Sequence, residues 1–399
     1  MVDDHRQPML RSTTGQAHQR YDVAIAGASF AGLMVALQLR GRAVVLDYQP
    51  VGDGQTSACG TTVAALRALD ALDAVEQVHE ELVLHLTPAT GPAREVRYRL
   101  PYAYCTFDYR KLCRHLAARA AARGIAFVRA RALGWRDGVL HTDRGPIGAR
   151  CVVDATGWRA TVASSIDPRY VRRDQLSCGL EAELPQPAAG FATGLHFWAG
   201  HGTVWPGYAW SFPCGPRARL GVIAYPGSAH EGEHARSSKG LREALDAFLD
   251  GPGAAYWSPD GGAPWSPGAA RPTGGRTLHG GFLPCAPRRA VVGPVFAVGD
   301  AAGQCFALTG EGIRPALAFA VRCGRLLQQT IEGRLTPAQA RAAYSRFVAV
   351  RSPYLRLMHV LQRRVGAMAD QGLTWYSRAA HPGAIFRFLM GQYAWPAWL

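Results

Sequence analysis

The segment YDVAIAGASFAGLMVALQLRGRAVVLD, residues 21–47, decides the fold because it predicts the order strand, tight turn, helix, strand. Residues 22–26 form a short apolar run, which is typical of a buried parallel strand. Residues 33–39 carry helical spacing, and Gly41 ends that helix. The apolar run 43–46 then returns to a strand. We therefore expect an α/β fold in which these strands belong to one parallel sheet.

The turn of this segment has the spacing of a dinucleotide-binding fingerprint. That fingerprint places glycine at the tight turn, at the close approach of the backbone to a pyrophosphate, and at the contact between helix and strand. Gly27 and Gly32 hold the first and third places, and Ser29 holds the second, where its N–H still lies at a helix N-terminus. Asp47 ends the second strand, where an acid can bind an adenosine ribose. We expect a bound nucleotide here, and a glycine-containing turn without a ligand is the alternative.

Two later segments, ARCVVDATGWRA (149–160) and GPVFAVGDAAGQ (293–304), each read as an apolar strand that ends in an acid and a glycine. The carboxyl ends of parallel strands meet at the edge of the sheet where ligands bind. There an acid can accept a hydrogen bond from a ribityl hydroxyl, and glycines let the backbone approach a flavin ring. The helix after the second segment can stabilise negative charge on that ring. The candidate cofactor residues of this region are Asp154, Gly157, Gly299, Asp300, Gly303 and Gly312.

The stretch GYAWSFP, residues 207–213, carries three rings on alternate positions. In a strand this spacing sends all three rings to one face. A core strand more often carries Val, Ile and Leu and seldom ends in proline, so we predict the apolar wall of a pocket, with a core strand as the alternative. The residues that we expect to bind substrate are Phe197, Trp205, Tyr208, Trp210 and Phe212.

With these motifs in this order, residues 21–347 resemble the FAD-dependent oxidoreductase superfamily of para-hydroxybenzoate hydroxylase type, and within it the geranylgeranyl reductase family. The likeness to that family is carried by the pair Cys59-Gly60, by the helix opening DYRKLCRHLAARAAARG (108–124), and by YAWSFP, which matches the pattern Tyr-x-Trp-x-Phe-Pro throughout. The resemblance implies a Rossmann-like FAD-binding domain with a parallel sheet, a substrate domain with a mostly antiparallel β-sheet, and FAD bound noncovalently. It also implies hydride transfer from reduced flavin to an alkene of a hydrophobic, prenyl-type substrate.

The resemblance also assigns roles to particular positions. Cys59 lies near the reacting bond, and Tyr208 and Trp210 line the substrate channel beside the flavin, so these three are the candidate catalytic residues. The FAD-binding residues that it implies are Gly27, Ser29, Gly32, Asp47, Arg110, Gly299 and Asp300. The chain differs from the family pattern at four positions. Ser29 replaces a glycine, and Tyr48 and Tyr109 stand where basic residues are expected. The family also has two glycines one residue apart after the aromatic segment; here Gly221 keeps the first, and Ile223 replaces the second.

Three functions remain open at this stage. In the leading one, a reductase, an acid protonates the alkene, and Cys59, His196 and Tyr208 are the candidate donors. The runner-up is a flavin monooxygenase, a hydroxylase or epoxidase, that acts on an aromatic or polycyclic substrate; halogenation is less favoured because the first lysine, Lys111, lies on a helix. The third is a noncatalytic electron-relay flavoprotein bound to a partner. The expected external electron donor is NAD(P)H or ferredoxin, so an electron-donor protein is a candidate partner.

We expect a discontinuous domain organisation. Residues 1–20 read as a disordered tail; 21–82, 109–160 and 278–335 as the FAD-binding domain; 83–108 and 161–277 as the substrate domain; and 336–399 as a C-terminal helical region. The Gly- and Pro-rich stretch 251–276 is a surface insertion or, less favoured, a lid over the pocket. The C-terminal helices complete the substrate lobe or form a dimer contact, and contact with a membrane surface is the alternative.

Charge and cysteine content narrow the class of protein. The 399 residues carry a formal net charge of +15, but the arginines are scattered and no nucleic-acid motif is present, so this charge favours an anionic ligand or a membrane surface over nucleic acid. The partner that we expect is a small hydrophobic substrate. The 9 cysteines are odd in number and form no CxxC pair, which predicts neither a disulfide framework nor a metal site. The N-terminal residues do not resemble a signal peptide, so we expect a cytoplasmic protein.

Overall fold

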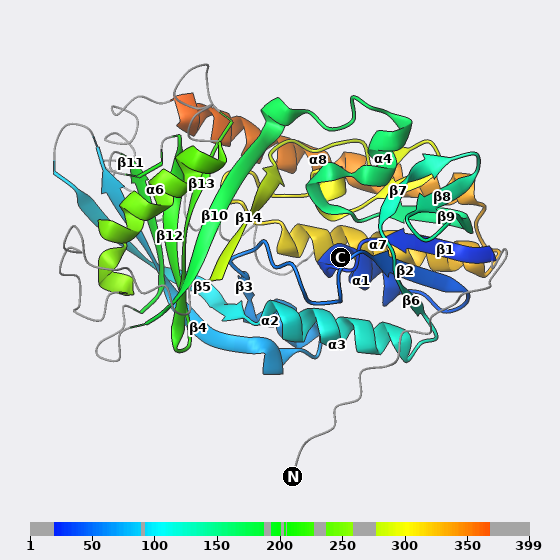
Figure 1. Ribbon diagram of the computed structural model, residues 1–399, viewed down its shortest axis with the longest axis horizontal. Helices are drawn as coiled ribbons and strands as arrows, with labels where there is room; N and C mark the ends of the chain where they lie inside the picture. The colour runs from blue at the N-terminus through cyan, green and yellow to red at the C-terminus, as the bar shows by residue number, and fades with distance from the viewer. Residues whose placement is uncertain are drawn as a thin grey trace, which may run out of the picture.

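The computed structural model describes residues 20–88, 92–186, 193–200, 203–204, 206–226, 237–257 and 277–367. Two eight-stranded sheets, here called sheet A and sheet B, make up its centre. Figure 1 shows them side by side, with helices α1, α3 and α7 packed around sheet A. The predictions for 1–19, for Trp205, for 258–276 and for 368–399 fall outside the described residues.

Sheet A contains the parallel strands that the opening segment predicts. Its order is β15 (Val291–Val292), β16 (Val295–Ala297), β9 (Ile147–Asp154), β1 (Arg20–Ala26), β2 (Ala43–Asp47) and β6 (Ala126–Arg129). The strands from β16 to β6 are mutually parallel, with Val23 paired to Ala43 on one side and to Cys151 on the other. β15 pairs with β16 in antiparallel fashion, and β7 (Ala132–Arg136) joins through β8 (Val139–Thr142) to β9.

The alternation of side chains along β1 explains how sheet A is covered. Val23 and Ile25 pack into a core with α1 (Phe30–Ala36), α3 (Tyr109–Ala121) and α7 (Ile313–Ile331). Ala24 and Ala26 face a second core, which includes Val162 of α4 (Thr161–Ile166). Because both faces of the strand are buried, its sequence is a continuous apolar run rather than an alternating one.

Sheet B is antiparallel except for one pair of strands. Its order is β14 (Thr277–Pro284), β10 (Leu176–Pro185), β13 (Arg217–Ala224), β12 (Gly207–Cys214), β11 (Leu195–Gly200), β4 (Val75–Thr87), β5 (Arg94–Phe107) and β3 (Gly60–Thr62), and only β11 and β4 run parallel. One face packs against α6 (Ser238–Asp250), with Trp198 and Leu220 meeting Phe248 in one core. The predicted fold class, a parallel sheet with helices plus a mostly antiparallel sheet, is confirmed.

The remaining elements complete the frame around the two sheets. α2 (Val63–Ala68) follows β3, and α8 (Pro337–Ala367), with Pro353 inside it, packs against α7. Short 3₁₀ turns occur at Leu72–Ala74, Gly157–Arg159, Arg173–Gln175, Ala254–Tyr256 and Gly299–Ala302. None of the helices within the described ranges is both long and apolar enough to cross a membrane. Sheet B draws β3 and the start of β4 from the segment predicted to belong to the FAD-binding domain, and the domain boundaries stay predictions.

The glycine that follows the 3₁₀ turn Gly299–Ala302 gives a first test. Gly303 has a φ of 64°, and a Cβ added there lies 2.1 Å from the Ala286 carbonyl oxygen. Gly303→Ala therefore adds a backbone clash to the cost of the left-handed conformation, and we expect a loss of about 3 kcal/mol in the free energy of unfolding. Gly138→Ala is the matched control, because its φ is 77° and no atom lies within 4 Å of an added Cβ; its loss is about 1 kcal/mol. Guanidinium unfolding measures both, and equal losses contradict the clash.

Candidate active site

Two cavities meet at the carboxyl edge of sheet A, beside sheet B. The larger has a volume of about 1140 Å³ and begins at Gly27 and Asp47. The smaller, of about 250 Å³, extends between the sheets to Trp210. Residues that line both cavities are Ser29, Thr56, Tyr109, Ala155, Gly157, Gly179, Leu180, His279, Gly280, Gly281, Phe282 and Asp300. The two spaces are therefore contiguous, and a ligand that enters at the fingerprint turn can reach the aromatic strand.

The fingerprint glycines serve close backbone packing. A Cβ on Gly27, whose φ is 109°, lies 2.1 Å from the Ala155 carbonyl oxygen at the end of β9. A Cβ on Gly32 lies 1.9 Å from the Gly27 carbonyl oxygen, so α1 can approach the turn only without a side chain there. Ser29 occupies the N-cap of α1, and its hydroxyl accepts a hydrogen bond from the Tyr109 hydroxyl at 3.1 Å. Gly27 and Ser29 line the larger cavity, and Gly32 lies behind it.

Asp47 holds the turn and faces the larger cavity. Its Oδ2 accepts the Ala28 backbone N–H at 2.7 Å, and its Oδ1 accepts that of Gln49 at 3.0 Å. Each carboxylate oxygen retains a second lone pair, so a ribose hydroxyl still finds an acceptor. Next to it, the Arg131 guanidinium lies 4.3 Å from the centre of the Tyr48 ring, and both side chains line the same cavity.

Asp300, in the 3₁₀ turn that follows β16, lines both cavities. None of the residues that the structure describes donates a hydrogen bond to its carboxylate, and removal from solvent raises the pKa of this group to about 6, with the Arg288 charge opposing the rise. A Cβ on Gly312 lies 3.2 Å from Asp300 Oδ1, so glycine leaves this acid accessible. Gly157, with a φ of 72°, and Gly299, with a φ of 63°, also line the smaller cavity.

Besides Gly32, three predicted cofactor residues do not line either cavity. The Asp154 carboxylate is buried and accepts backbone hydrogen bonds from Thr156, Val162 and Ala163 at 2.8–3.0 Å, so it holds the start of α4. Gly303 packs on the opposite side of its turn. Arg110 forms an ion pair with Asp53 at 3.0 Å and is largely exposed, while the preceding Tyr109 lines both cavities.

The rings of β12 form one wall of the smaller cavity. Tyr208, Trp210 and Phe212 all line it, and Phe197 of β11 packs edge-on against Tyr208 and Phe212 with ring centres 5.6 and 5.3 Å apart. The Tyr208 hydroxyl donates to the Thr309 carbonyl oxygen at 2.6 Å, which ties β12 to the turn before α7. This cluster of four rings is here called the aromatic wall.

Cys59, which precedes β3, lies at the smaller cavity, whereas His196 of β11 does not. Cys59, with a φ of 55°, lines the smaller cavity, and its thiol donates to the Ser57 carbonyl oxygen at 3.2 Å. Burial raises the pKa of this thiol well above its ordinary value. His196 lies outside the lining of both cavities and bonds to His85 at 2.9 Å, which makes its candidacy as a proton donor wrong. The reason is the strand alternation: Phe197 faces the cavity, so its neighbour His196 faces away.

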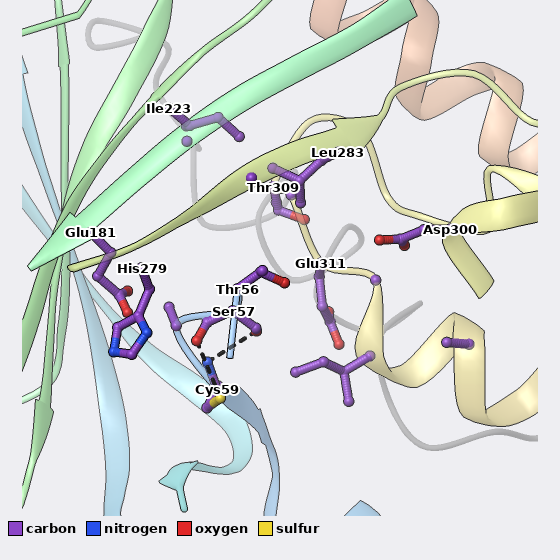
Figure 2. Close-up of a pocket in the computed structure, with 18 of the residues that line it drawn as sticks. Thr56, Ser57, Cys59, Glu181, Ile223, His279, Leu283, Asp300, Thr309 and Glu311 are labelled. Atoms are coloured by element: carbon purple, nitrogen blue, oxygen red, sulfur yellow. Dashed lines mark hydrogen bonds between the residues drawn. The ribbon is translucent and has the colours of Figure 1, made fainter. Parts of the chain in front are cut away.

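A carboxyl group that the sequence analysis missed lies in the same wall. Glu181 is 3% exposed, lines the smaller cavity and accepts the Trp210 indole N–H at 2.9 Å. Figure 2 shows Glu181 and His279 side by side, with Cys59 beneath them and Asp300 across the cavity. The sequence did contain a signal for Glu181. In the strand LSCGLEAELP this acid lies two residues from Gly179 and therefore on the same face, and the missing side chain of the glycine leaves space beside the carboxyl group.

The turn before α7 adds further polar groups to the smaller cavity. Thr309 and Glu311 line it, and Cys305 does not. Glu311 forms a buried ion pair with Arg314 of α7, and both side chains lie in the lining. The opposite side is apolar, with Leu82, Leu100 and Leu195 contributed by sheet B.

Several solved structures share this fold, among them that of a flavin-dependent enzyme. A geranylgeranyl bacteriochlorophyll reductase-like protein of Thermoplasma acidophilum matches with a TM-score of 0.71 over 89% of each chain, at 17% identity. A flavin-dependent brominase matches with a TM-score of 0.64, at 14% identity, over 95% of this chain and 96% of its own. An oxygenase of 2-methyl-3-hydroxypyridine-5-carboxylic acid matches with a TM-score of 0.58, at 19% identity, over 94% of this chain and 96% of its own.

These similarities establish the fold. No protein-family model matches the sequence, and no curated protein matches it. The matching structures include reductase-like, halogenating and oxygenating proteins, so the fold alone does not choose among these chemistries.

The burial of the Asp300 carboxylate predicts a pH-dependent stability. Its pKa in the folded chain, about 6, lies above the ordinary value, so the folded state loses stability as pH rises from about 4 through 6. Asp300→Asn removes this loss. In protein without a bound ligand, we expect the variant to be more stable than the wild type by on the order of 1 kcal/mol at pH 7.5 and equal to it at pH 4, since water in the cavity screens the charge.

Urea unfolding at both pH values measures the difference. Asp167→Asn serves as the control, because Asp167 is a surface acid that forms an ion pair with Arg289. A constant difference between Asp300→Asn and wild type across this pH range contradicts the assignment.

Proposed function

We propose that this protein is an FAD-dependent oxidoreductase that reduces an alkene in a hydrophobic, prenyl-type substrate. The observation that carries the proposal is the contiguity of the two cavities: one begins at a dinucleotide-type turn, and the other ends at the aromatic wall. The shared fold with flavin enzymes supports it. Bound FAD would supply the hydride, and an external donor would reduce the flavin again, either NAD(P)H by hydride transfer or two equivalents of reduced ferredoxin by electron transfer with uptake of protons.

The residues present fit FAD. Asp47 offers carboxylate oxygens to an adenosine ribose, and the turn from Gly27 to Ser29 offers backbone N–H groups near a pyrophosphate. Asp300 offers a carboxylate with no hydrogen-bond donor among the described residues, which suits a ribityl hydroxyl. Gly157 and Gly312 leave the backbone accessible to a flat ring system.

The chain's own contribution to the reaction is a water-poor space of restricted shape. The aromatic wall and the leucines beside it on sheet B remove an apolar substrate from water, which favours binding in proportion to the apolar area buried. The hydrogen bond from Tyr208 to Thr309 holds the wall against the turn before α7, where the flavin would lie. An isolated alkene is a poor hydride acceptor, so a proton donor must act beside this wall.

The competing function is a flavin monooxygenase, which the oxygenase and the brominase of the same fold represent. Such an enzyme uses the same apolar shield to keep water from an oxygenated flavin, so the cavity by itself serves either chemistry. The aromatic wall accommodates a polycyclic ring as well as a prenyl chain.

Anaerobic stopped-flow measurements separate the two functions. We expect the dithionite-reduced protein, loaded with FAD, to be reoxidised by at least one member of a panel of prenyl alkenes without oxygen. Polycyclic aromatic compounds are the control substrates. No reoxidation by any alkene, together with an oxygenated product from an aromatic substrate in air, contradicts the reductase and establishes the monooxygenase.

Ile223 limits the space beside the aromatic wall. It pairs with Tyr208 across β12 and β13 and lines the smaller cavity. We expect Ile223→Ala to raise the ratio of kcat/KM for a large alkene to that for a small alkene by about 10-fold. Removing a few methyl or methylene groups from a pocket changes the discrimination between substrates of different size by that order.

Val222→Ala is the matched control, since Val222 lies on the same strand and packs on the opposite face with α6. The ratio of kcat/KM for a large and a small alkene is the readout. Equal ratios in the two variants contradict the placement of Ile223 beside the substrate.

A further inference from the structure

Glu181, Gly221 and Trp210 form a line across three strands of sheet B. Glu181 of β10 pairs with Gly221 of β13, and Gly221 pairs with Trp210 of β12. Because Gly221 has no side chain, the indole lies flat over it: an added Cβ at Gly221 lies 2.2 Å from a ring carbon of Trp210. The indole N–H can thus cross β13 and donate to Glu181 Oε2 at 2.9 Å.

The second oxygen of this carboxyl group is unused. Glu181 is buried, and its Oε1 has no hydrogen-bond partner within the described part of the chain, although the residue lines the smaller cavity. A buried polar atom without a partner costs on the order of 1–3 kcal/mol, so such atoms need an explanation. A protonated carboxyl that meets the substrate explains this one.

The charges around Glu181 suit a group that alternates between its neutral and ionised forms. Arg219 is the nearby cation, but its guanidinium is already paired with Glu76 at 2.8 Å and with Glu183 at 3.2 Å. It therefore stabilises a carboxylate at Glu181 without a direct ion pair. Burial raises the pKa of Glu181 to about 7, while Arg219 and the Trp210 N–H oppose the rise.

Other potential donors in the cavity are less suited. The Cys59 thiol donates to Ser57, and its pKa lies well above the ordinary value for a thiol. The Tyr208 hydroxyl donates to Thr309, and burial raises its pKa further. His279 lies next to Glu181 with Nδ1 bonded to the Gln55 carbonyl, and burial lowers its pKa, so it is neutral at pH 7.

We propose that Glu181 is the catalytic proton donor of this site and that Trp210 is its positioning residue, an inference that rests on the proposed alkene reduction. The alkene π bond is consumed as one carbon receives a hydride from the reduced cofactor and its neighbour receives the Glu181 proton. The O–H bond of Glu181 breaks and a C–H bond forms, which leaves a carboxylate held by the Trp210 N–H and the Arg219 charge. Water restores the proton after the product leaves.

Single-turnover reduction of an alkene, followed by flavin absorbance across pH, tests this role. The wild-type rate falls as pH rises through about 7, because the donor must be protonated. Glu181→Gln keeps an acceptor for the indole N–H but has no acidic proton, so the rate drops by about 100-fold or more and becomes independent of pH over this range. A Glu181→Gln protein with the wild-type rate and pH profile overturns the proposal.

Trp210→Phe tests positioning separately from packing. It keeps an aromatic ring and removes the N–H that stabilises the carboxylate, so the pKa of Glu181 rises and the fall in rate moves to higher pH. Trp198→Phe, on the opposite face of sheet B, is the matched control and leaves the profile in place. An unchanged profile in Trp210→Phe overturns the positioning role.

A readout that does not depend on turnover is infrared difference spectroscopy of the FAD-loaded protein during a pH titration. We expect a C=O band of a protonated carboxyl that disappears as pH rises through about 7 in the wild type and is absent from Glu181→Gln. Its absence from the wild type overturns the proposal.

The variants also separate this inference from the proposed function. If wild-type protein reduces no alkene although the band titrates as expected, the proposed reduction fails and the donor role falls with it. If alkenes are reduced but Cys59→Ser, rather than Glu181→Gln, abolishes the fall in rate with pH, the reductase stands and the donor is Cys59.

Discussion

The close approach of two backbone turns determines where the cavities can lie. Gly27 at the end of β1 meets the Ala155 carbonyl at the end of β9, and Gly32 lets α1 pack onto the same turn. Any side chain at these points separates the strands from the helix. Because β1 lies between β2 and β9, this contact places Asp47 and Ser29 along one edge of sheet A. The larger cavity follows from that edge.

The second sheet converts this edge into an enclosed site. Sheet B presents one face to α6 and the other to the smaller cavity, so alternate residues of each strand serve different purposes. Phe197 enters the aromatic wall while His196 joins a cluster on the far side. A shift of one residue in the strand register would turn His196 toward the cavity and Phe197 away from it. The pairing of the strands therefore matters for the site as much as the identity of the side chains.

Apolar walls and a few polar atoms give the site its chemical character. The carboxyl groups of Asp300 and Glu181 lie on opposite sides of the cavity, and within the described ranges no residue donates to the Asp300 carboxylate or to Glu181 Oε1. A carboxyl group removed from water is harder to ionise, so both have a raised pKa. Each costs the folded chain stability, and that cost is typical of groups retained to contact a ligand.

The sequence by itself determined the parallel sheet, the fingerprint turn and the spacing of the aromatic wall, because these depend on local periodicity and on glycine. Only the tertiary structure decided which acids line the cavities. Asp154 ends β9, and Asp300 follows β16 in the 3₁₀ turn Gly299–Ala302. The first carboxylate holds α4 and the second lines the cavity, because the backbone N–H groups of the described residues donate to Asp154 and not to Asp300. Glu181 meets Trp210 across the whole width of β13 because Gly221 leaves the space open. Such contacts join residues distant in sequence, and no local pattern specifies them.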